Sequence, residues 1–193
     1  MTENKKLIIN KPNKKDLIGL KRGTVKLVPY DSKWINLFQK EKQCLMESFG
    51  NTIISIEHIG STAIIGMNAK PIIDIEIGVE SLAVALAMKK QFESLGYTHR
   101  PNVPEILKWE ELYVKGIEEK RTHYAHVTVY NGIHWKNDLL FRDYLCKNYT
   151  HAKQYARLKI KLAKKYKNDR KTYTENKKEF INKIMKIAKQ SLN

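Results

Sequence analysis

The sequence predicts an α+β fold, a mixed β-sheet with flanking helices and a helical C-terminal extension. Up to residue 136, apolar runs of strand length alternate with amphipathic segments of helix length, whereas the apolar period over 137–193 is helical. The chain has 193 residues, 42% of them hydrophobic, which is enough for a single packed domain over 23–193. We expect roughly four to six strands in the sheet.

The elements before residue 137 follow from apolar spacing and turn residues. Strands are expected at 25–28, 53–57 and 72–78, and a hairpin with a longer loop at 106–115 and 122–130. A helix is expected at 31–48, capped by Asp31 or Ser32, and a second at 81–95, capped by Ser81. A short helical turn is expected at 61–65.

Three helices are expected in the C-terminal part. The first contains the string FRDYL after a cap at Asn137 or Asp138, the second spans 151–166, and the third spans 172–192 with Thr172 or Thr174 as cap. Residues 1–22 are rich in Lys and Asn and lack an apolar period, so they are expected to form a mobile basic arm.

The net charge of +16 is concentrated at the two ends of the sequence. Residues 1–30 carry +6 and residues 151–193 carry +11, which leaves −1 for the middle. A basic tail is suited to nucleic acid or another polyanion, or it is simply a Lys-rich solvated helix surface. Lys outnumbers Arg and no aromatic–arginine interleaving occurs, which favours the solvated surface.

The remaining composition indicates a cytoplasmic protein without a membrane segment. Cys44 and Cys146 lie in helix-like patterns without metal-ligand spacing, so buried free thiols in a reducing compartment are expected. The sequence contains neither a run of about 18 apolar residues nor an N-terminal signal pattern.

The central motif is IEHIGSTAIIGMNAKPIIDIEIGV, residues 56–79. Side chains alternate along a strand, so Asp74 and Glu76 share one face, while the isoleucines between and around them face the core. Two adjacent carboxylates repel each other, which should raise the pKa of one of them. Mg²⁺ or Mn²⁺ prefers such oxygens, with phosphates completing its shell, so this pair is the candidate metal site.

A candidate phosphate site precedes the acidic strand. Gly60 lets the backbone approach a ligand closely, and Ser61 and Thr62 are residue types that open a helix with free N–H groups. Lys70, just before the strand, is a further candidate phosphate contact or a counter-charge for the carboxylates.

The Gly-Ser turn followed by Asp-x-Glu on a strand resembles the nucleotidyltransferase superfamily, and the string HIGSTAIIGMNAKPIIDI resembles the GrpB family of that fold. The likeness continues over nearly the whole chain. It is carried by these strings: Arg121-Thr122-His123, His126-Val127, FRDYL, Tyr155 with Leu158-Lys159, Tyr173-Thr174 with Lys177, and Phe180-Ile181. It implies that Gly60 and Ser61 hold the triphosphate of an NTP, while Asp74 and Glu76 bind Mg²⁺.

The superfamily also has a third carboxylate on a later strand, and 122–130 contains none. His126 stands on the polar face of that strand, as a general base, a metal ligand or an ordinary hydrogen-bonded histidine. Glu110 or Glu111 is the other candidate for this position.

The remaining polar residues of the motifs are assigned as follows. Arg142 is a candidate phosphate contact, with a structural ion pair to Asp143 as the commoner alternative. His58, Asp143 and Lys159 are interpreted as structural.

Three functions follow from these residues and from the resemblance. The first is Mg²⁺-dependent transfer of a nucleotidyl group from an NTP to an unknown acceptor, which is a small molecule, RNA or protein. The alternative is a degenerate module of the same fold that binds nucleotide or RNA without turnover. The third is a role near coenzyme A metabolism, by family analogy alone, because this chain has no P-loop and is not itself such a kinase.

Overall fold

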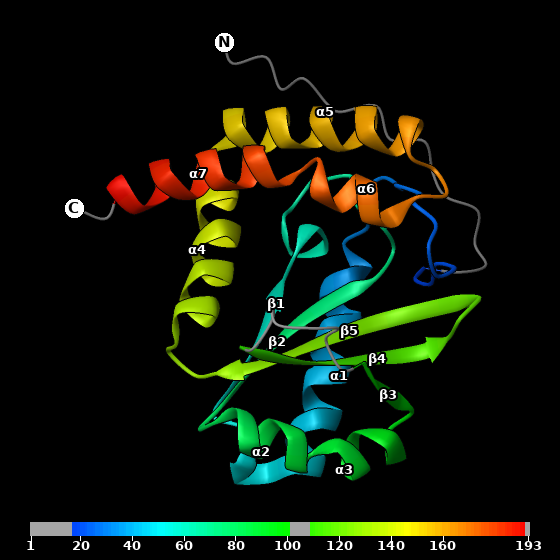
Figure 1. Ribbon diagram of the computed structural model, residues 1–193, viewed down its shortest axis with the longest axis vertical. Helices are drawn as coiled ribbons and strands as arrows, with labels where there is room; N and C mark the ends of the chain where they lie inside the picture. The colour runs from blue at the N-terminus through cyan, green and yellow to red at the C-terminus, as the bar shows by residue number, and fades with distance from the viewer. Residues whose placement is uncertain (1–16, 101–108, 192–193) are drawn as a thin grey trace.

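The computed structural model describes residues 17–100 and 109–191, which form one five-stranded mixed sheet with helices on both faces (Figure 1). The strands are β1 (Ser55–Ile59), β2 (Ile73–Val79), β3 (Tyr97–Arg100), β4 (Glu110–Ile117) and β5 (Lys120–Val129). Their order in the sheet is β1-β2-β5-β4-β3. The predicted α+β class and its mixed sheet are therefore confirmed.

The strand register places the polar side chains of the central motif beside those of the hairpin. β2 pairs parallel with β5, and Glu76 lies opposite His126. On its other side β2 pairs antiparallel with β1, so that Asp74 lies opposite Ile59, the last residue before the Gly60 turn. β4 pairs antiparallel with both β5 and β3.

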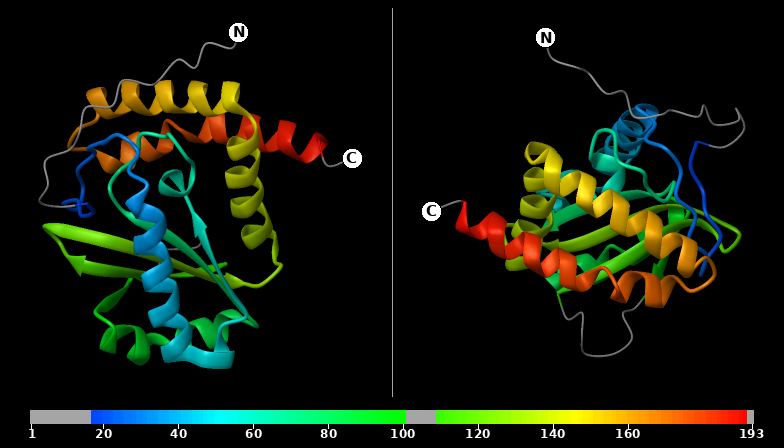
Figure 2. Two further views of the ribbon diagram at one scale, coloured as in Figure 1. Left: turned by 180° about the vertical axis from the view of Figure 1, so that it is seen from behind. Right: turned by 90° about the horizontal axis from the view of Figure 1, so that it is seen from above.

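One face of the sheet carries the main hydrophobic core. Ile73, Ile75 and Ile77 point to this face and are fully buried, because alternate residues of a strand share a face. The helices α1 (Lys33–Phe49), α2 (Leu82–Ala87) and α3 (Lys89–Ser94) cover it (Figure 2).

The other face is flanked by α4 (Ile133–Lys147), α5 (Tyr149–Lys165), α6 (Arg170–Glu175) and α7 (Lys178–Gln190). α5 lies beside α6 and α7 across one end of the sheet, and α4 runs along its side (Figures 1 and 2). A second hydrophobic cluster joins α4, α5 and α7 to Ile64 and Met67, which follow the Gly60 turn. This cluster holds the C-terminal helices over the turn.

Three expectations about the elements before α4 are wrong, and one strand was not expected. Residues 25–28 form a single bridge, Val28 to Ala69, instead of a strand. The helix expected at 81–95 breaks at Met88 into α2 and α3. The short strand β3 was not expected, because it follows Gly96 with little apolar alternation. The expected hairpin loop at 116–120 is only a two-residue turn between β4 and β5.

One of the two expected helix starts is confirmed and the other is wrong. Of the two residues expected to cap α1, Asp31 makes the side-chain contact, because its Oδ1 accepts a hydrogen bond from Lys33 N at 2.9 Å, whereas Ser32 makes none. α4 begins at Ile133, so Asn137 and Asp138 lie inside the helix and neither caps it.

The last expected helix is two helices, α6 and α7. Asp169 caps α6 by accepting from Thr172 N at 3.0 Å, in place of the expected threonine cap.

The two cysteines are not both buried, because Cys44 is half-buried and Cys146 is exposed. The expected arm lies outside the described residues over 1–16, as does the expected strand over 106–108. Among the helices that the structure describes, none is both long and apolar enough to span a membrane.

Candidate functional site

The turn after β1 brings Gly60 against the first carboxylate of β2. Gly60 has φ 68° and ψ −168°, a conformation that only glycine adopts readily. A Cβ at this position would lie 2.5 Å from Asp74 Oδ2. The glycine is therefore required both by its backbone conformation and by the approach of Asp74, and the carboxylate lies directly beside the Gly-Ser turn.

The two hydroxyl residues of the turn point to different partners. The short 3-10 helix Ser61–Ala63 replaces the expected turn at 61–65. Thr62 Oγ1 lies 2.9 Å from His58 Nε2, and the His58 ring stacks on Phe38 with centroids 4.7 Å apart. Ser61 Oγ accepts a hydrogen bond at 2.7 Å from Lys159 Nζ, which also donates to Asn68 O at 2.7 Å. Lys159 thus connects α5 to both ends of this loop.

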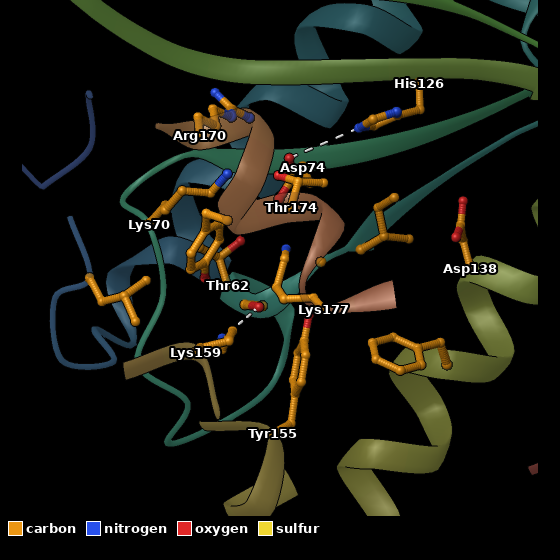
Figure 3. A pocket seen from close by; sticks show the side chains of 16 residues that line it. Thr62, Lys70, Asp74, His126, Asp138, Tyr155, Lys159, Arg170, Thr174 and Lys177 are labelled. Atoms are coloured by element: carbon orange, nitrogen blue, oxygen red, sulfur yellow. Dashed lines mark hydrogen bonds and ion pairs between the residues drawn. The ribbon is translucent and has the colours of Figure 1, made fainter. Parts of the chain in front are cut away.

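A cavity of about 400 Å³ opens beside the turn, under α5, α6 and the start of α7 (Figure 3). Besides His126, three lysines and an arginine line it: Lys70, Lys159, Arg170 and Lys177. Among the described residues of its lining, only Asp74 and Asp138 are acidic. The cavity therefore has more positive than negative side chains, which suits a polyanion such as a chain of phosphates.

Burial, and next to it the neighbouring cations, lowers the pKa values of the three lysines. Burial, together with Arg170 and Lys177, lowers the pKa of Lys70 to about 7. Burial and Arg170 lower the pKa of Lys177 to about 8, against the attraction of Asp74. Lys159 is 2% exposed, and burial holds its pKa well below the usual value. A bound anion would restore the charge of all three lysines.

The two carboxylates of β2 lie in different surroundings. Glu76 is fully buried, and its Oε1 accepts from Thr128 Oγ1 at 2.6 Å, while its Oε2 has no hydrogen-bond partner. Burial raises the pKa of Glu76 to about 8, with Asp138 and Glu110 adding to the shift. The expected rise in the pKa of one carboxylate is confirmed, but burial is its main cause and repulsion by Asp74 is not.

Asp74 stays ionised because cations surround it. Burial alone would raise its pKa, but the nearby His126, together with Lys70 and Arg170, brings the pKa below its usual value.

His126 lies between two acids on the polar face of the sheet. Its Nδ1 is 2.7 Å from Glu110 Oε2, and its Nε2 is 4.0 Å from Asp74 Oδ1. Burial opposes the charged ring, yet Glu110 and Asp74 raise the pKa of His126 well above 6.5. Of the two alternative acids, Glu110 belongs to this group, whereas Glu111 Oε2 contacts His99 Nε2 at 2.5 Å. His126 therefore stands beside the carboxylates as a cation.

The candidate metal ligands of the site suit a metal ion that is bound together with phosphates better than a metal ion held by protein side chains alone. No group of three or more His, Cys, Asp and Glu side chains within 17–100 and 109–191 is placed to hold an ion. Mg²⁺ commonly takes one or two carboxylates and completes its shell with phosphate oxygens and water. Asp74, which lines the cavity, fits that pattern, whereas Glu76 is fully buried, is not among the residues that line the cavity, and would have to lose its proton to join.

Arg142, a candidate phosphate contact, lies apart from the cavity. It donates from Nη1 to Glu57 Oε2 at 2.8 Å and to His58 O at 2.9 Å. Its Nε donates to Asp143 Oδ1 at 2.7 Å. The guanidinium thus joins α4 to β1, in line with the structural alternative.

The sequence reasoning missed part of the cavity wall. Arg170 was counted only in the basic tail, Lys177 appeared only there and in the family resemblance, and Lys159 was interpreted as structural. A signal was present, because most of the C-terminal residues that carried the family resemblance line the cavity: Tyr155, Lys159, Tyr173, Thr174 and Lys177. The favoured solvated surface is therefore wrong for these lysines of the tail.

Comparisons with known proteins show the family and the fold of this chain. The sequence model for GrpB protein matches residues 24–187. Glutamate-rich protein GrpB of Alkalihalophilus pseudofirmus is 39% identical over 173 residues, which are 88% of this chain and 98% of that protein. A Mycobacterium bovis protein named dephospho-CoA kinase is 28% identical over 149 residues, 66% of this chain and 37% of that longer protein.

A solved structure has the same fold. The crystal structure of conserved protein GrpB from Enterococcus faecalis superposes with a TM-score of 0.79 at 30% identity, covering 87% of this chain and all of that one. Because the family match spans most of the chain and the relatives share both sequence and fold, this protein belongs to the GrpB family.

Proposed function

We propose that this protein is a Mg²⁺-dependent nucleotidyltransferase that takes an NTP as donor. The observation that supports this most directly is the cation cluster beside Asp74, at the Gly60 turn. A triphosphate is the common metabolic group whose charge matches several lysines and an arginine around a single cavity. Asp74, which lines the same cavity, then provides for a metal that accompanies the phosphates, with Glu76 two residues further along β2.

Different side chains of the cavity have different roles in binding the NTP and the metal. Lys70, Lys177 and Arg170 neutralise phosphate oxygens, and each lysine regains its proton as the anion enters. Gly60 leaves room for Asp74 beside the turn. Asp74 and Glu76 would hold Mg²⁺, which supplies charge stabilisation at the transferring phosphorus. Lys159 orients Ser61 through its hydrogen bond.

A second candidate is a nucleotide-binding module without turnover. Its support is His126, which occupies the strand position of the expected third acid and is paired with Glu110 at 2.7 Å. A charged imidazole there neither binds a metal nor accepts a proton. Turnover and binding therefore need to be measured separately.

The test is a screen of the four NTPs with Mg²⁺ or Mn²⁺ that records pyrophosphate release, together with calorimetry of NTP binding. Asp74→Asn keeps the shape of the site and should remove Mg²⁺-dependent NTP binding. Glu80→Gln is the matched control, because Glu80 is exposed at the far end of β2. NTP binding without release of pyrophosphate would favour the second candidate, the nucleotide-binding module without turnover. Equal NTP binding by wild type and Asp74→Asn, with or without Mg²⁺, would show that the acidic pair is not a metal site.

A further inference from the structure

A second cavity lies on the other side of the same reactive residues. It has a volume of about 550 Å³ and shares four lining residues with the first: Asp74, His126, Arg170 and Thr174. In Figure 3, Arg170 and His126 approach Asp74 from the side away from Lys159. Asp74 therefore lines two cavities whose other lining residues differ.

The outer wall of the second cavity is also cationic. Arg22, Arg121, Lys171 and Lys178 line it together with Arg170, whereas Asp74 and Glu175 are the acids among its described residues. Cations thus outnumber acids in this cavity as they do in the first.

Glu118 forms ion pairs with three guanidiniums, two of which, those of Arg22 and Arg121, line the second cavity. Glu118 contacts Arg121 at 2.5 Å and Arg22 at 3.3 Å, and it also pairs with Arg100. One carboxylate does not neutralise three guanidiniums, so positive charge remains at the mouth of the cavity.

Arg170 forms the partition between the two cavities. Its guanidinium lies over the Tyr124 ring, 4.7 Å from the centroid, and its Nη1 donates to the Tyr124 hydroxyl. A planar guanidinium held in this way keeps further N–H donors for a ligand. Because Arg170 lines both cavities, it is placed to contact an anion on either side.

We propose that this second cavity, lined by Arg22, Arg121, Arg170 and Lys178, is the acceptor site and takes an acceptor that ends in a phosphate group. The transfer to this acceptor rests on the proposed function, whereas the binding of phosphate in the second cavity does not. Guanidinium groups bind phosphate through paired N–H donors, and the shared residue Asp74 places this cavity next to the donor.

The reaction is then transfer of a nucleoside monophosphate unit to a phosphate oxygen. The acceptor oxygen forms a bond to the α-phosphorus of the NTP. The bond from the α-phosphorus to the bridging oxygen breaks, and pyrophosphate leaves with its electron pair. A phosphate oxygen that is ionised at neutral pH carries no proton, so the attack needs no general base. The product is a phosphoanhydride.

Binding is tested with inorganic phosphate, by calorimetry and without nucleotide. The background variant Lys70→Gln/Lys177→Gln weakens the first cavity, so the remaining binding reports the second. Adding Arg22→Gln/Lys178→Gln should weaken phosphate binding at least about tenfold, from the loss of two charged contacts. Adding Lys33→Gln/Lys40→Gln, two exposed lysines of α1 on the opposite face, should change it less than about twofold. If the background variant does not fold, the two pairs of substitutions are compared in the wild-type protein. There Arg22→Gln/Lys178→Gln should remove one of two phosphate sites, and Lys33→Gln/Lys40→Gln should remove neither.

Transfer is tested with ³²P-labelled inorganic phosphate as the acceptor. With NTP and Mg²⁺, the label should appear in the β-phosphate of an NDP, and Arg22→Gln/Lys178→Gln should remove it while NTP affinity stays within about twofold. Phosphate binding that is equal in the Arg22/Lys178 and the Lys33/Lys40 variants overturns the second site. Phosphate binding that depends on Arg22 and Lys178, without labelled NDP or pyrophosphate from any NTP, overturns the transferase and leaves the second site standing.

Discussion

Lys159 Nζ donates a hydrogen bond to Ser61 Oγ at 2.7 Å and so joins residues 98 positions apart in the chain. The bond ties the helical C-terminal part to the turn that carries Gly60. It also holds a buried amine at the wall of the first cavity, where its charge depends on what the cavity contains. The C-terminal helices are therefore part of the candidate site as well as its cover.

Replacing Lys159 with Met should loosen the turn while keeping the helix packed. Met matches the length of the lysine stem but makes no bond to Ser61 Oγ or Asn68 O. We expect NTP affinity to fall about tenfold, as for one lost charge-assisted contact, and amide exchange at 60–63 to accelerate. Lys161→Met, at an exposed position of α5, is the control. Equal losses in both variants would mean that only the general charge of α5 matters.

Gly60→Ala should be markedly more destabilising than Gly66→Ala. Both glycines have positive φ, 68° and 78°, but only Gly60 has a neighbour within reach of a Cβ, Asp74 Oδ2 at 2.5 Å. We expect a loss of about 3 kcal/mol in unfolding free energy for Gly60→Ala, against about 1 kcal/mol for Gly66→Ala. Urea denaturation of the two variants measures this. Similar losses would show that the approach of Asp74 adds nothing to the requirement for glycine.

Glu76→Gln should change how stability depends on pH. Burial raises the pKa of Glu76 from 4.5 to about 8, so the folded protein favours the protonated form. The stability that the protonated Glu76 carboxyl contributes to the fold is fully present below pH 4.5 and is lost as the pH rises to about 8. In EDTA, Glu76→Gln should therefore match wild type near pH 4.5 and exceed it by about 5 kcal/mol at pH 9. A constant difference between the two proteins across this range would contradict the buried protonated carboxyl.

His126→Gln should have the opposite pH dependence. The pKa of His126 is raised well above 6.5 by Glu110 and Asp74, so its contribution to stability is complete below pH 6.5 and is lost as pH rises through the folded-state pKa. We expect the variant to be about 2 kcal/mol less stable than wild type at pH 6, with the gap closing at higher pH. The measurement is urea denaturation in EDTA, and His134→Gln, near the start of α4, is the control.

The sequence predicted the parts of the fold that depend on local pattern. The isoleucines of β2 alternate with its carboxylates, so its two faces were evident, and β2 and β5 were both expected close to their true bounds. β3 was not expected, because its four residues gain their strand conformation from pairing with β4. The break at Met88 was likewise missed, since apolar spacing continues across it.

The site was predictable only where its residues are close in sequence. Gly60 and Asp74 share one motif, and their contact follows from a short connection between antiparallel strands. Arg170 and Lys177 reach the same cavity through packing of α6 and α7, which no local pattern encodes. The burial of Glu76 and the pairing of His126 with Glu110 also depend on the sheet neighbours, so their charge states could not be read from the sequence.

The contact between Lys159 and Ser61 also has a consequence for the order of folding. The core around Ile75 is built mainly from α1 and neighbouring strands, whereas the first cavity needs a contact across 98 positions. Contacts that close long stretches of chain form late, because the entropy of closure opposes them. A ligand that requires the finished cavity stabilises only the native state. It should therefore slow unfolding without accelerating folding, and the unfolding rate falls in proportion to the fraction of the protein that carries no ligand.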